Sequence, residues 1–307
     1  MTTYLISGGT GLIGQQLINK LLTSKTHHIY ILTRTTHHSD NPQITYINWN
    51  EENWQHQVPN IDIVINLAGA TLSRYWTKTY KQKMMTSRIQ STRALFDLFS
   101  TREKIPSVMF NASAIGYYPP SNTAVYTEET QTSPHDFLSE IVYQWERQAN
   151  LFNQLRTRVI IGRFGLVLSN QGGAWPSMSL PYRCFIGGKL GNGKQPYSWI
   201  HIDDLVNAIV YLIHKPETTG AYNLTAPNPV TQHVLGLQVQ QVLKRPHYTR
   251  VPKGVLRLFL GEMATLLIDT QYVLPERLMK SEFQFQYPHL TQALEILHHE
   301  KKHTART

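Results

Sequence analysis

The chain has 307 residues, of which 41% are hydrophobic and 16% are charged. This length and composition are typical of one large α/β domain, or of a nucleotide-binding domain with a smaller partner domain. The formal net charge is +9, but Lys and Arg are scattered along the chain, and the one dense basic run is the tail 301–306. A solvated terminus explains that tail, so we expect no nucleic-acid partner. A basic surface also suits an anionic, phosphate-bearing ligand.

The cysteine and histidine content argues against several kinds of site. A single cysteine, Cys184, excludes an intramolecular disulfide and a cysteine-rich zinc site. The histidine pairs lack i, i+4 spacing beside a carboxylate, so we expect no metal. Met1 leads directly into the first apolar run, which leaves no room for a signal peptide, and no apolar run is long enough to cross a bilayer. We therefore expect a reducing, cytoplasmic setting and no membrane partner.

The first predicted element in chain order is a short apolar strand that ends in a glycine turn. The turn has the spacing Gly8-x-x-Gly11-x-x-Gly14, and the apolar residues 13, 17, 18, 21 and 22 follow at the spacing of one helix face. A strand, a glycine turn and a helix form a site for a dinucleotide pyrophosphate, because the backbone can approach the phosphates and the first helical turn directs free N–H groups at them. A glycine triple alone also fits an ordinary tight turn, but the flanking patterns favour the dinucleotide. The cofactor contacts predicted here are Gly8, Thr10, Gly11, Leu12 and Ile13.

The tip of the second predicted strand, 28–34, indicates which dinucleotide binds. An acidic residue about 20 positions past the glycines would hydrogen-bond the ribose 2′-OH of NAD. Arg34 occupies that position, and a guanidinium there would pair with a 2′-phosphate. An ordinary exposed arginine after a strand is the alternative interpretation. The sequence therefore favours NADP(H). Leu67, Ala68 and Gly69 follow the fourth strand where the adenosine side would lie, although strand-to-loop packing explains them equally well.

Strands alternate with helices through the first part of the chain, which predicts a parallel, doubly wound α/β sheet of the Rossmann type. The predicted strands are 28–34, 44–49, 61–69, 108–113 and 158–164, and the predicted helices are 77–100 and 137–152, the second capped by Asp136. A glycine-rich segment, 172–198, is typical of an irregular connection that serves as a lid or substrate loop. A helix over 205–213, capped by Asp203 or Asp204, follows. We expect a dinucleotide-binding domain over 1–225 and a smaller, mainly helical substrate lobe over 226–307.

Several short motifs stand in a characteristic order along nearly the whole chain. They are GGTGLIG (8–14), LTR (32–34), NLAGA (66–70), SRIQSTR (87–93), ASAIGYY (112–118), WE (145–146), RFGLVL (163–168), GGKLGNGKQ (187–195), WIHIDDL (199–205) and NLTAPNPVT (223–231). In this order they resemble the extended short-chain dehydrogenase/reductase superfamily. More narrowly, they resemble its atypical "epimerase family" branch, which ends in a small C-terminal domain of its own, here 246–296.

The resemblance implies a catalytic Ser, Tyr and Lys, of which this chain matches only the first. In the superfamily the Ser polarises a substrate carbonyl or hydroxyl, and a Tyr with a Lys four residues later transfers the proton. Ser113 corresponds to the Ser. Counted back from the WE motif, the tyrosine position falls at 137 or 138 and the lysine position at 141 or 142, where the residues are apolar. Tyr143 and Arg147 have the right spacing but lie more than a helical turn out of place.

Other side chains could supply the missing proton transfer. Tyr117 and Tyr118 follow Ser113 in the next loop, and we name Tyr117 with Ser113 as the candidate catalytic residues. The carboxylates of 128 and 129 are further candidates, although packed aromatics and solvated loop charges are the simpler explanations. Arg163 could contact an anionic substrate or anchor its loop through a buried ion pair. The resemblance implies that His201 and Asp204 cap a helix and hold the substrate loop.

Two functions remain open at this stage. One is an NADP(H)-dependent oxidoreductase or epimerase acting on a small polar substrate such as a nucleotide-sugar. The other is an NADPH-binding protein with little or no catalysis, which the missing Tyr and Lys favour. The superfamily's habit also implies a homodimer through the helices 77–100 and 137–152.

Overall fold

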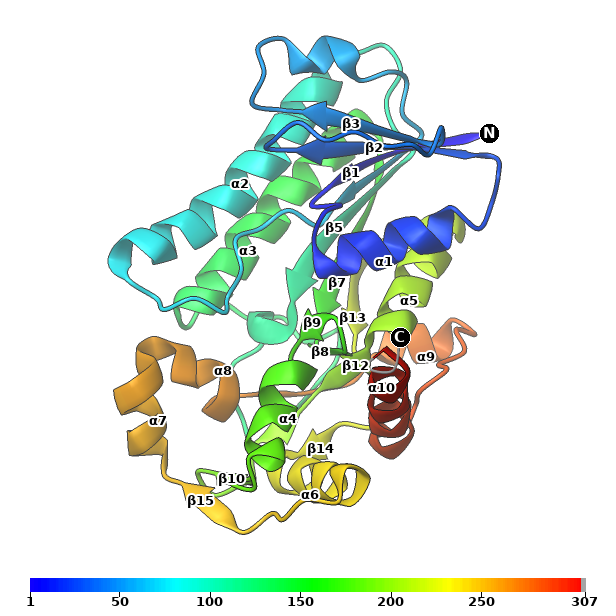
Figure 1. Cartoon of the computed structure of the whole chain (residues 1–307). Coiled ribbons are helices and arrows are strands. Elements are labelled where there is room, and N and C mark those ends of the chain that lie inside the picture. Colours follow the sequence, from blue (N-terminus) through cyan, green and yellow to red (C-terminus); the bar gives the residue numbers. More distant parts are fainter. Residues whose placement is uncertain (305–307) are drawn as a thin grey trace.

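The computed structural model describes the backbone of residues 1–304 and the side chains of residues 1–299. At its centre lies a seven-stranded sheet in the order β13-β7-β5-β4-β1-β2-β3, in which every neighbouring pair is parallel (Figure 1). Its strands are β1 (Thr2–Ser7), β2 (His27–Thr33), β3 (Ile44–Asn48), β4 (Ile63–Asn66), β5 (Val108–Ala114), β7 (Arg158–Phe164) and β13 (Gly220–Leu224). The chain runs outward from β1 to β3 and then crosses to β4, so the strand order reverses between β1 and β4. This confirms the predicted Rossmann-type sheet. In such sheets ligands bind at the carboxyl ends of the strands, at the point where the strand order reverses.

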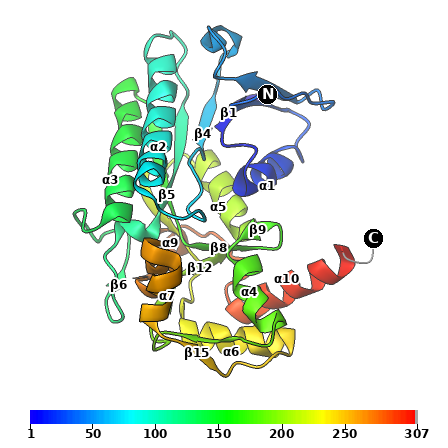
Figure 2. The same ribbon diagram turned by 60° about the vertical axis from the view of Figure 1, so that its left-hand side comes forward.

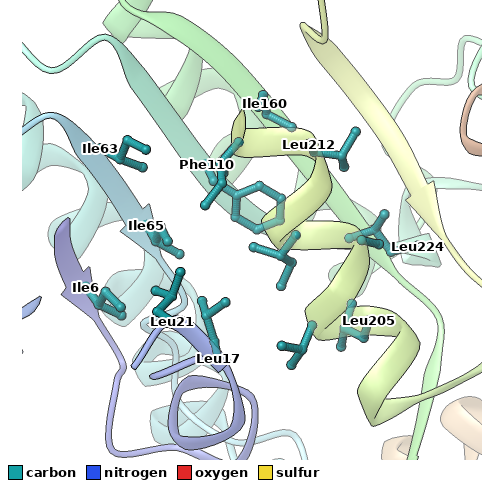
Figure 3. Packing of buried hydrophobic residues seen from close by; sticks show 14 of the residues in the cluster. Ile6, Leu17, Leu21, Ile63, Ile65, Phe110, Ile160, Leu205, Leu212 and Leu224 are labelled. Atoms are coloured by element: carbon teal, nitrogen blue, oxygen red, sulfur yellow. The ribbon is translucent and has the colours of Figure 1, made fainter. Parts of the chain in front are cut away.

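Helices cover both faces of the sheet. On one face α1 (Leu12–Leu21) packs beside α5 (Ile202–His214), and on the other α2 (Lys78–Ser100) packs beside α3 (Phe137–Asn150) (Figure 2). Successive strand residues point to opposite faces, so that Ile6 belongs to the same core cluster as Leu17 and Leu205, which Figure 3 shows, while Leu5 lies in a second core with Phe99. The strands are therefore apolar on both sides, which explains their continuous hydrophobic runs.

Side-chain caps set the start of four helices, α2, α3, α5 and α6. The Thr77 hydroxyl accepts the N–H of the third residue of α2 at 3.2 Å. Asp136 accepts the N–H of Ser139 at 2.7 Å, and the Ser139 hydroxyl accepts the N–H of Asp136 at 2.8 Å, which confirms the predicted cap of α3. The predicted aspartate cap of α5 is wrong. His201 is the N-cap, its Nδ1 accepts the N–H of Asp203 at 3.3 Å, and both aspartates lie inside the first turn.

The C-terminal lobe is built from two stretches of chain that lie far apart in the sequence. The segment 172–198, expected to be an irregular connection, contains α4 (Trp175–Arg183), β9 (Gly172–Gly173), β10 (Gly188–Leu190) and β11 (Pro196–Tyr197). β10 pairs with β15, β11 pairs with β14, and α4 packs on α6. These partners follow only after residue 229, so the local pattern did not reveal them. The expectation of irregular structure was wrong here.

The other elements complete this lobe and its junction with the sheet. They are β6 (Val125–Tyr126), β8 (Leu166–Ser169), β12 (Trp199–His201), β14 (Val230–Thr231), α6 (Gln232–Leu243), β15 (Thr249–Val251), α7 (Lys253–Leu260), α8 (Thr265–Ile268), β16 (Tyr272–Val273), α9 (Glu276–Lys280) and α10 (Leu290–Thr304), together with the 3-10 turns Trp54–Gln57, Ile115–Tyr117, Leu151–Leu155 and Gly261–Ala264. No helix within residues 1–304 is long and apolar enough to span a bilayer. The side chains of the basic tail 301–306 lie outside the described residues.

Candidate functional site

The glycine turn after β1 has no room for side chains at two of its positions. Gly8 has φ of +76°, and a Cβ there would lie 2.6 Å from the carbonyl carbon of Leu67. A Cβ on Gly14 would lie 2.4 Å from the Gly8 carbonyl oxygen. Gly11 precedes α1 as its N-cap and offers no side-chain cap, which leaves the first N–H groups of the helix available to a ligand. The turn is therefore shaped for an anion such as a pyrophosphate.

A cavity of about 550 Å³ extends from this turn to the C-terminal lobe. Its walls come from the glycine turn, the loop after β4, the end of β5, one face of α3 and the segments around β8, β11 and α8. The lining includes these predicted site residues: Gly8, Gly11, Leu12, Ile13, Leu67, Gly69 and Ser113. The continuity of the cavity joins the dinucleotide turn to the predicted catalytic serine in one space.

The remaining predicted cofactor residues do not line the cavity. Thr10 is exposed at the tip of the glycine turn, and Ala68 lies beside Gly8 in the loop after β4. Arg34 is exposed and directly follows β2, whose Leu32 is in register with the last residue of β1. The parallel register therefore brings Arg34 to the same edge of the sheet as the glycine turn. This edge is where the adenosine ribose of a dinucleotide lies in a Rossmann domain.

Ser113 belongs to a buried polar network beneath the cavity. Its hydroxyl donates to Oε1 of Glu146 at 2.6 Å. Arg163 donates two hydrogen bonds to the same carboxylate, from Nε to Oε1 and from Nη2 to Oε2, each at 2.9 Å. Burial opposes the charge of Arg163, but the hydrogen bonds and charge of Glu146 raise the pKa of this guanidinium above its ordinary value. Arg163 is thus held in a bidentate ion pair, and the buried-anchor interpretation describes it better than contact with a substrate.

The network continues away from the cavity to β13 at the edge of the sheet. Arg163 also donates to the hydroxyl of Tyr118 at 2.9 Å, and that hydroxyl donates to Oδ1 of Asn223 at 2.9 Å. Tyr117 packs its ring against the guanidinium of Arg163, 3.4 Å from the ring centroid, and its hydroxyl accepts the N–H of Thr132. The ring of Tyr117 lies against this ion pair and not along the cavity wall. Its catalytic role stays a prediction.

The face of α3 that lines the cavity is apolar. It presents Leu138, Ile141, Val142 and Trp145. The tyrosine position (137 or 138) and the lysine position (141 or 142) implied by the superfamily therefore hold apolar residues. Tyr143 and Arg147 lie on the opposite, exposed face. Neither can contact a ligand in the cavity, and proton transfer by a Tyr-Lys pair on this helix is ruled out.

His201 and Asp204 tie the sheet domain to the lobe. His201 is buried, caps α5 and packs against the ring of Tyr287 at 4.2 Å between centroids. The Asp204 carboxylate accepts the N–H groups of Gln286 and Tyr287 at 2.7 and 2.9 Å. Burial raises the pKa of Asp204, although these two hydrogen bonds oppose the shift. Both residues have structural roles.

Arg88 is a cavity residue that the sequence did not single out. It comes from α2, lines the cavity, and lies against Gly69, where a Cβ would approach its guanidinium carbon to 2.9 Å. The guanidinium donates to the carbonyl of Met84 at 3.0 Å and lies 5.1 Å from the ring centroid of Trp145. Burial lowers the pKa of Arg88 to about 10. Among the described residues no carboxylate lies within 4.0 Å of it, which favours an anionic ligand. Its presence in the SRIQSTR motif was the only signal in the sequence.

Comparison with known proteins identifies the family. Residues 4–225 match the NAD dependent epimerase/dehydratase family, and residues 251–297 match a domain of unknown function (DUF1731). The chain is 56% identical over 297 residues to an epimerase family protein of Staphylococcus epidermidis, and 55% identical over 298 residues to one of Staphylococcus aureus; each alignment covers 97% of this chain and 99% of the relative.

Solved structures agree with this assignment. The crystal structure of human epimerase family protein SDR39U1 with NADPH has a TM-score of 0.88 and 29% identity, over 97% of this chain and 99% of that one. A nucleoside-diphosphate sugar epimerase from Corynebacterium glutamicum has a TM-score of 0.77 and 26% identity, over 97% of this chain and 57% of that one. The chain therefore belongs to the NAD dependent epimerase/dehydratase family, as the resemblance predicted, and this family binds NAD or NADP.

Proposed function

We propose that this member of the NAD dependent epimerase/dehydratase family is an NADP(H)-dependent oxidoreductase or epimerase acting in the cytoplasm on a small polar substrate. The observation that carries the proposal is the single cavity that joins the glycine turn to Ser113. A dinucleotide whose pyrophosphate rests on the turn has space to extend toward that serine. When bound, the nicotinamide supplies or accepts the hydride. Nucleotide-sugars are the first substrate class to test, because the Corynebacterium neighbour is described as a nucleoside-diphosphate sugar epimerase.

The preference for NADP(H) rests on Arg34. Its guanidinium is exposed at the edge of the sheet that carries the glycine turn, where a 2′-phosphate would find a planar, bidentate partner. The human neighbour, which was crystallised with NADPH, supports this assignment. We expect the wild type to bind NADPH at least tenfold more tightly than NADH, and Arg34→Ala to remove most of that difference. Equal affinities of the wild type for the two cofactors would refute the proposal.

The second part of the proposal concerns the proton. The only hydrogen of the Ser113 hydroxyl is committed to Glu146, so the serine oxygen can accept a hydrogen bond from a group in the cavity but has no hydrogen left to donate. A substrate hydroxyl is such a donor. As hydride leaves its carbon, the hydroxyl proton passes to Ser113 Oγ and the serine proton passes to Glu146. Reduction of a carbonyl runs along the same path in reverse. Arg163 keeps Glu146 in place through two hydrogen bonds.

The second candidate function is an NADPH-binding protein with little or no catalysis. Leu138 and Val142 favour it, because they leave the cavity wall without the tyrosine and lysine of the superfamily. A panel of carbonyl compounds, alcohols and sugar nucleotides, tested with NADPH or NADP⁺, separates the two. Turnover that falls at least 100-fold in Ser113→Ala, with NADPH affinity retained, supports the enzyme. Tight NADPH binding with no turnover above that of Ser113→Ala supports the binding protein.

The proposal includes a homodimer through the exposed faces of α2 and α3. Tyr143 is the one large hydrophobic side chain exposed on α3, whose residues are all described. Sedimentation of the wild type and of Tyr143→Glu tests this interface, since a charge in the centre of it would favour the monomer.

A further inference from the structure

Exposed hydrophobic side chains gather at one end of the molecule. Of the fourteen large hydrophobic residues exposed in the described structure, nine belong to the lobe between residues 180 and 259. We call them the lobe apolar set: Leu180, Phe185, Ile186, Val234, Leu237, Tyr248, Val255, Leu258 and Phe259. They come from α4 and the turn after it, α6, the residue before β15, and α7. These elements lie in the half of the molecule opposite β2 and β3, with α6 and β15 at its far end (Figure 1).

The charge of this end is mostly positive, although Glu262 directly follows α7 and the Asp269 carboxylate lies 3.6 Å from the Arg257 guanidinium. The segments 174–198 and 226–261 contain no Asp and no Glu. Their basic residues are Arg183, Lys189, Lys194, Lys244, Arg245, Arg250, Lys253 and Arg257. The parallel pairing of β10 with β15 places Lys189 opposite Arg250. Like charges across a strand pair repel one another, so this arrangement favours an anionic partner that neutralises both.

Helix α7 shows most clearly that something is missing from this end. None of its residues is buried, and Leu258 and Phe259 are 78% and 75% exposed. A helix of this length derives little stability from its own hydrogen bonds and normally depends on packing of its apolar face. Leu258 and Phe259 are adjacent in the chain, and Tyr248 in the segment before β15 is 70% exposed. Large apolar side chains left this exposed indicate a surface that lacks a cover.

We propose that this end of the lobe is a docking surface for an anionic phospholipid membrane, which the protein contacts peripherally. A protein partner would favour a continuous apolar centre depleted of lysine, with the charges at the rim. Here cations and apolar side chains alternate instead. The Arg245 guanidinium lies 4.5 Å from the ring centroid of Phe185, and Arg257 directly precedes Leu258. Apolar tips that enter the headgroup layer between cations that meet lipid phosphates are the pattern of interfacial binding.

This inference does not conflict with the absence of a spanning helix. Contact with the surface of a bilayer needs only a shallow apolar face and cations, and no apolar run of about 20 residues. The docking surface is also separate from the cavity, because none of the lobe apolar set lines it. Membrane binding and cofactor binding can therefore be measured and lost independently.

The experiment is co-sedimentation of the full chain with vesicles of phosphatidylcholine alone or with about 30% phosphatidylglycerol, at low and high salt. We expect binding to the anionic vesicles only, weakened by salt. Lys244→Gln/Arg250→Gln should bind about 30-fold more weakly, because each neutralised residue costs about fivefold near an anionic surface. Leu258→Ser/Phe259→Ser should bind at least tenfold more weakly. The matched control, Lys25→Gln/Lys83→Gln, removes two exposed lysines elsewhere and should bind like the wild type.

Several results would overturn the proposal. These are absence of binding to anionic vesicles at low salt, equal binding to neutral vesicles, and a loss in the control variant as large as in the lobe variants. Self-association of the wild type that disappears in Leu258→Ser/Phe259→Ser, without vesicle binding, would assign the surface to a second copy of the chain. Thermal melting of each variant shows that it folds, and failure of NADPH binding would leave the vesicle result unaffected.

Discussion

The buried pair of Glu146 and Arg163 gives the most demanding test of the site as described. In Glu146→Gln the amide oxygen can still accept from Nε of Arg163, but the amide N–H₂ then faces a guanidinium nitrogen that had donated to Oε2 at 2.9 Å. The side chains of Glu146 and Arg163 are 11% and 6% exposed, so water cannot replace the lost acceptor. Removing one partner of such a pair costs about 3–5 kcal/mol. We expect a loss of about 3 kcal/mol and a fall in Tm of about 6 °C.

Urea denaturation followed by fluorescence measures this loss, and a second variant separates its cause. Glu146→Gln/Arg163→Met removes both charges and should cost less than the two single changes added together, with a coupling of about 2 kcal/mol. Asp97→Asn breaks the exposed pair of Arg93 and Asp97, which has the same 2.9 Å contact, and should cost no more than about 0.5 kcal/mol. A loss below about 1 kcal/mol in Glu146→Gln, or simple additivity in the double variant, would refute the buried network.

Three further predictions follow from single positions. Gly14→Ala should lower stability by about 1–3 kcal/mol and weaken NADPH binding at least tenfold, because the new Cβ would lie 2.4 Å from the Gly8 carbonyl oxygen. The control is Gly254→Ala, where no atom lies within 4 Å of the new Cβ. In urea denaturation this control should be neutral or stabilising. Asp136→Ala should cost about 1 kcal/mol in the same assay, since α3 loses its cap, and an unchanged urea midpoint would contradict the capping role. Burial and the neighbouring His233 lower the pKa of His247 below its ordinary 6.5, so its stabilising contribution is complete above pH 6.5 and is lost as pH falls through the folded-state value. His247→Gln should therefore lose less stability on acidification than the wild type, and parallel pH curves would contradict this.

The local pattern of the chain was sufficient for the sheet domain. Apolar runs of four to seven residues marked the strands, and the stretch without Gly or Pro marked α2, which extends over Lys78–Ser100. These elements depend on short-range periodicity and on burial of both sheet faces, and both leave a direct record in the sequence. The cap of α3 was predictable for the same reason, because Asp136 acts on a residue only three positions away.

The C-terminal lobe was harder to predict because its contacts join distant segments. The glycines of 172–198 suggested irregular structure, whereas β10 pairs with β15 about 60 residues later. The cap of α5 was misassigned for a related reason. Asp203 and Asp204 are residue types that often cap helices. The carboxylate of Asp204, however, accepts hydrogen bonds from the backbone N–H groups of Gln286 and Tyr287.

The sequence by itself determined the family, the dinucleotide turn and Ser113 as the candidate at the end of β5, since each depends on residue types at short, fixed spacing. Only the tertiary structure decided that the Ser113 hydroxyl donates to Glu146. Glu146 lies 33 residues after Ser113 and 17 residues before Arg163, and the three meet because α3 packs on the sheet. The tertiary structure also decided that Leu138 and Val142, and not Tyr143 and Arg147, face the cavity. Which face of a helix lines a cavity depends on how the helix packs. Counting residues along the helix predicts that face only to within one turn.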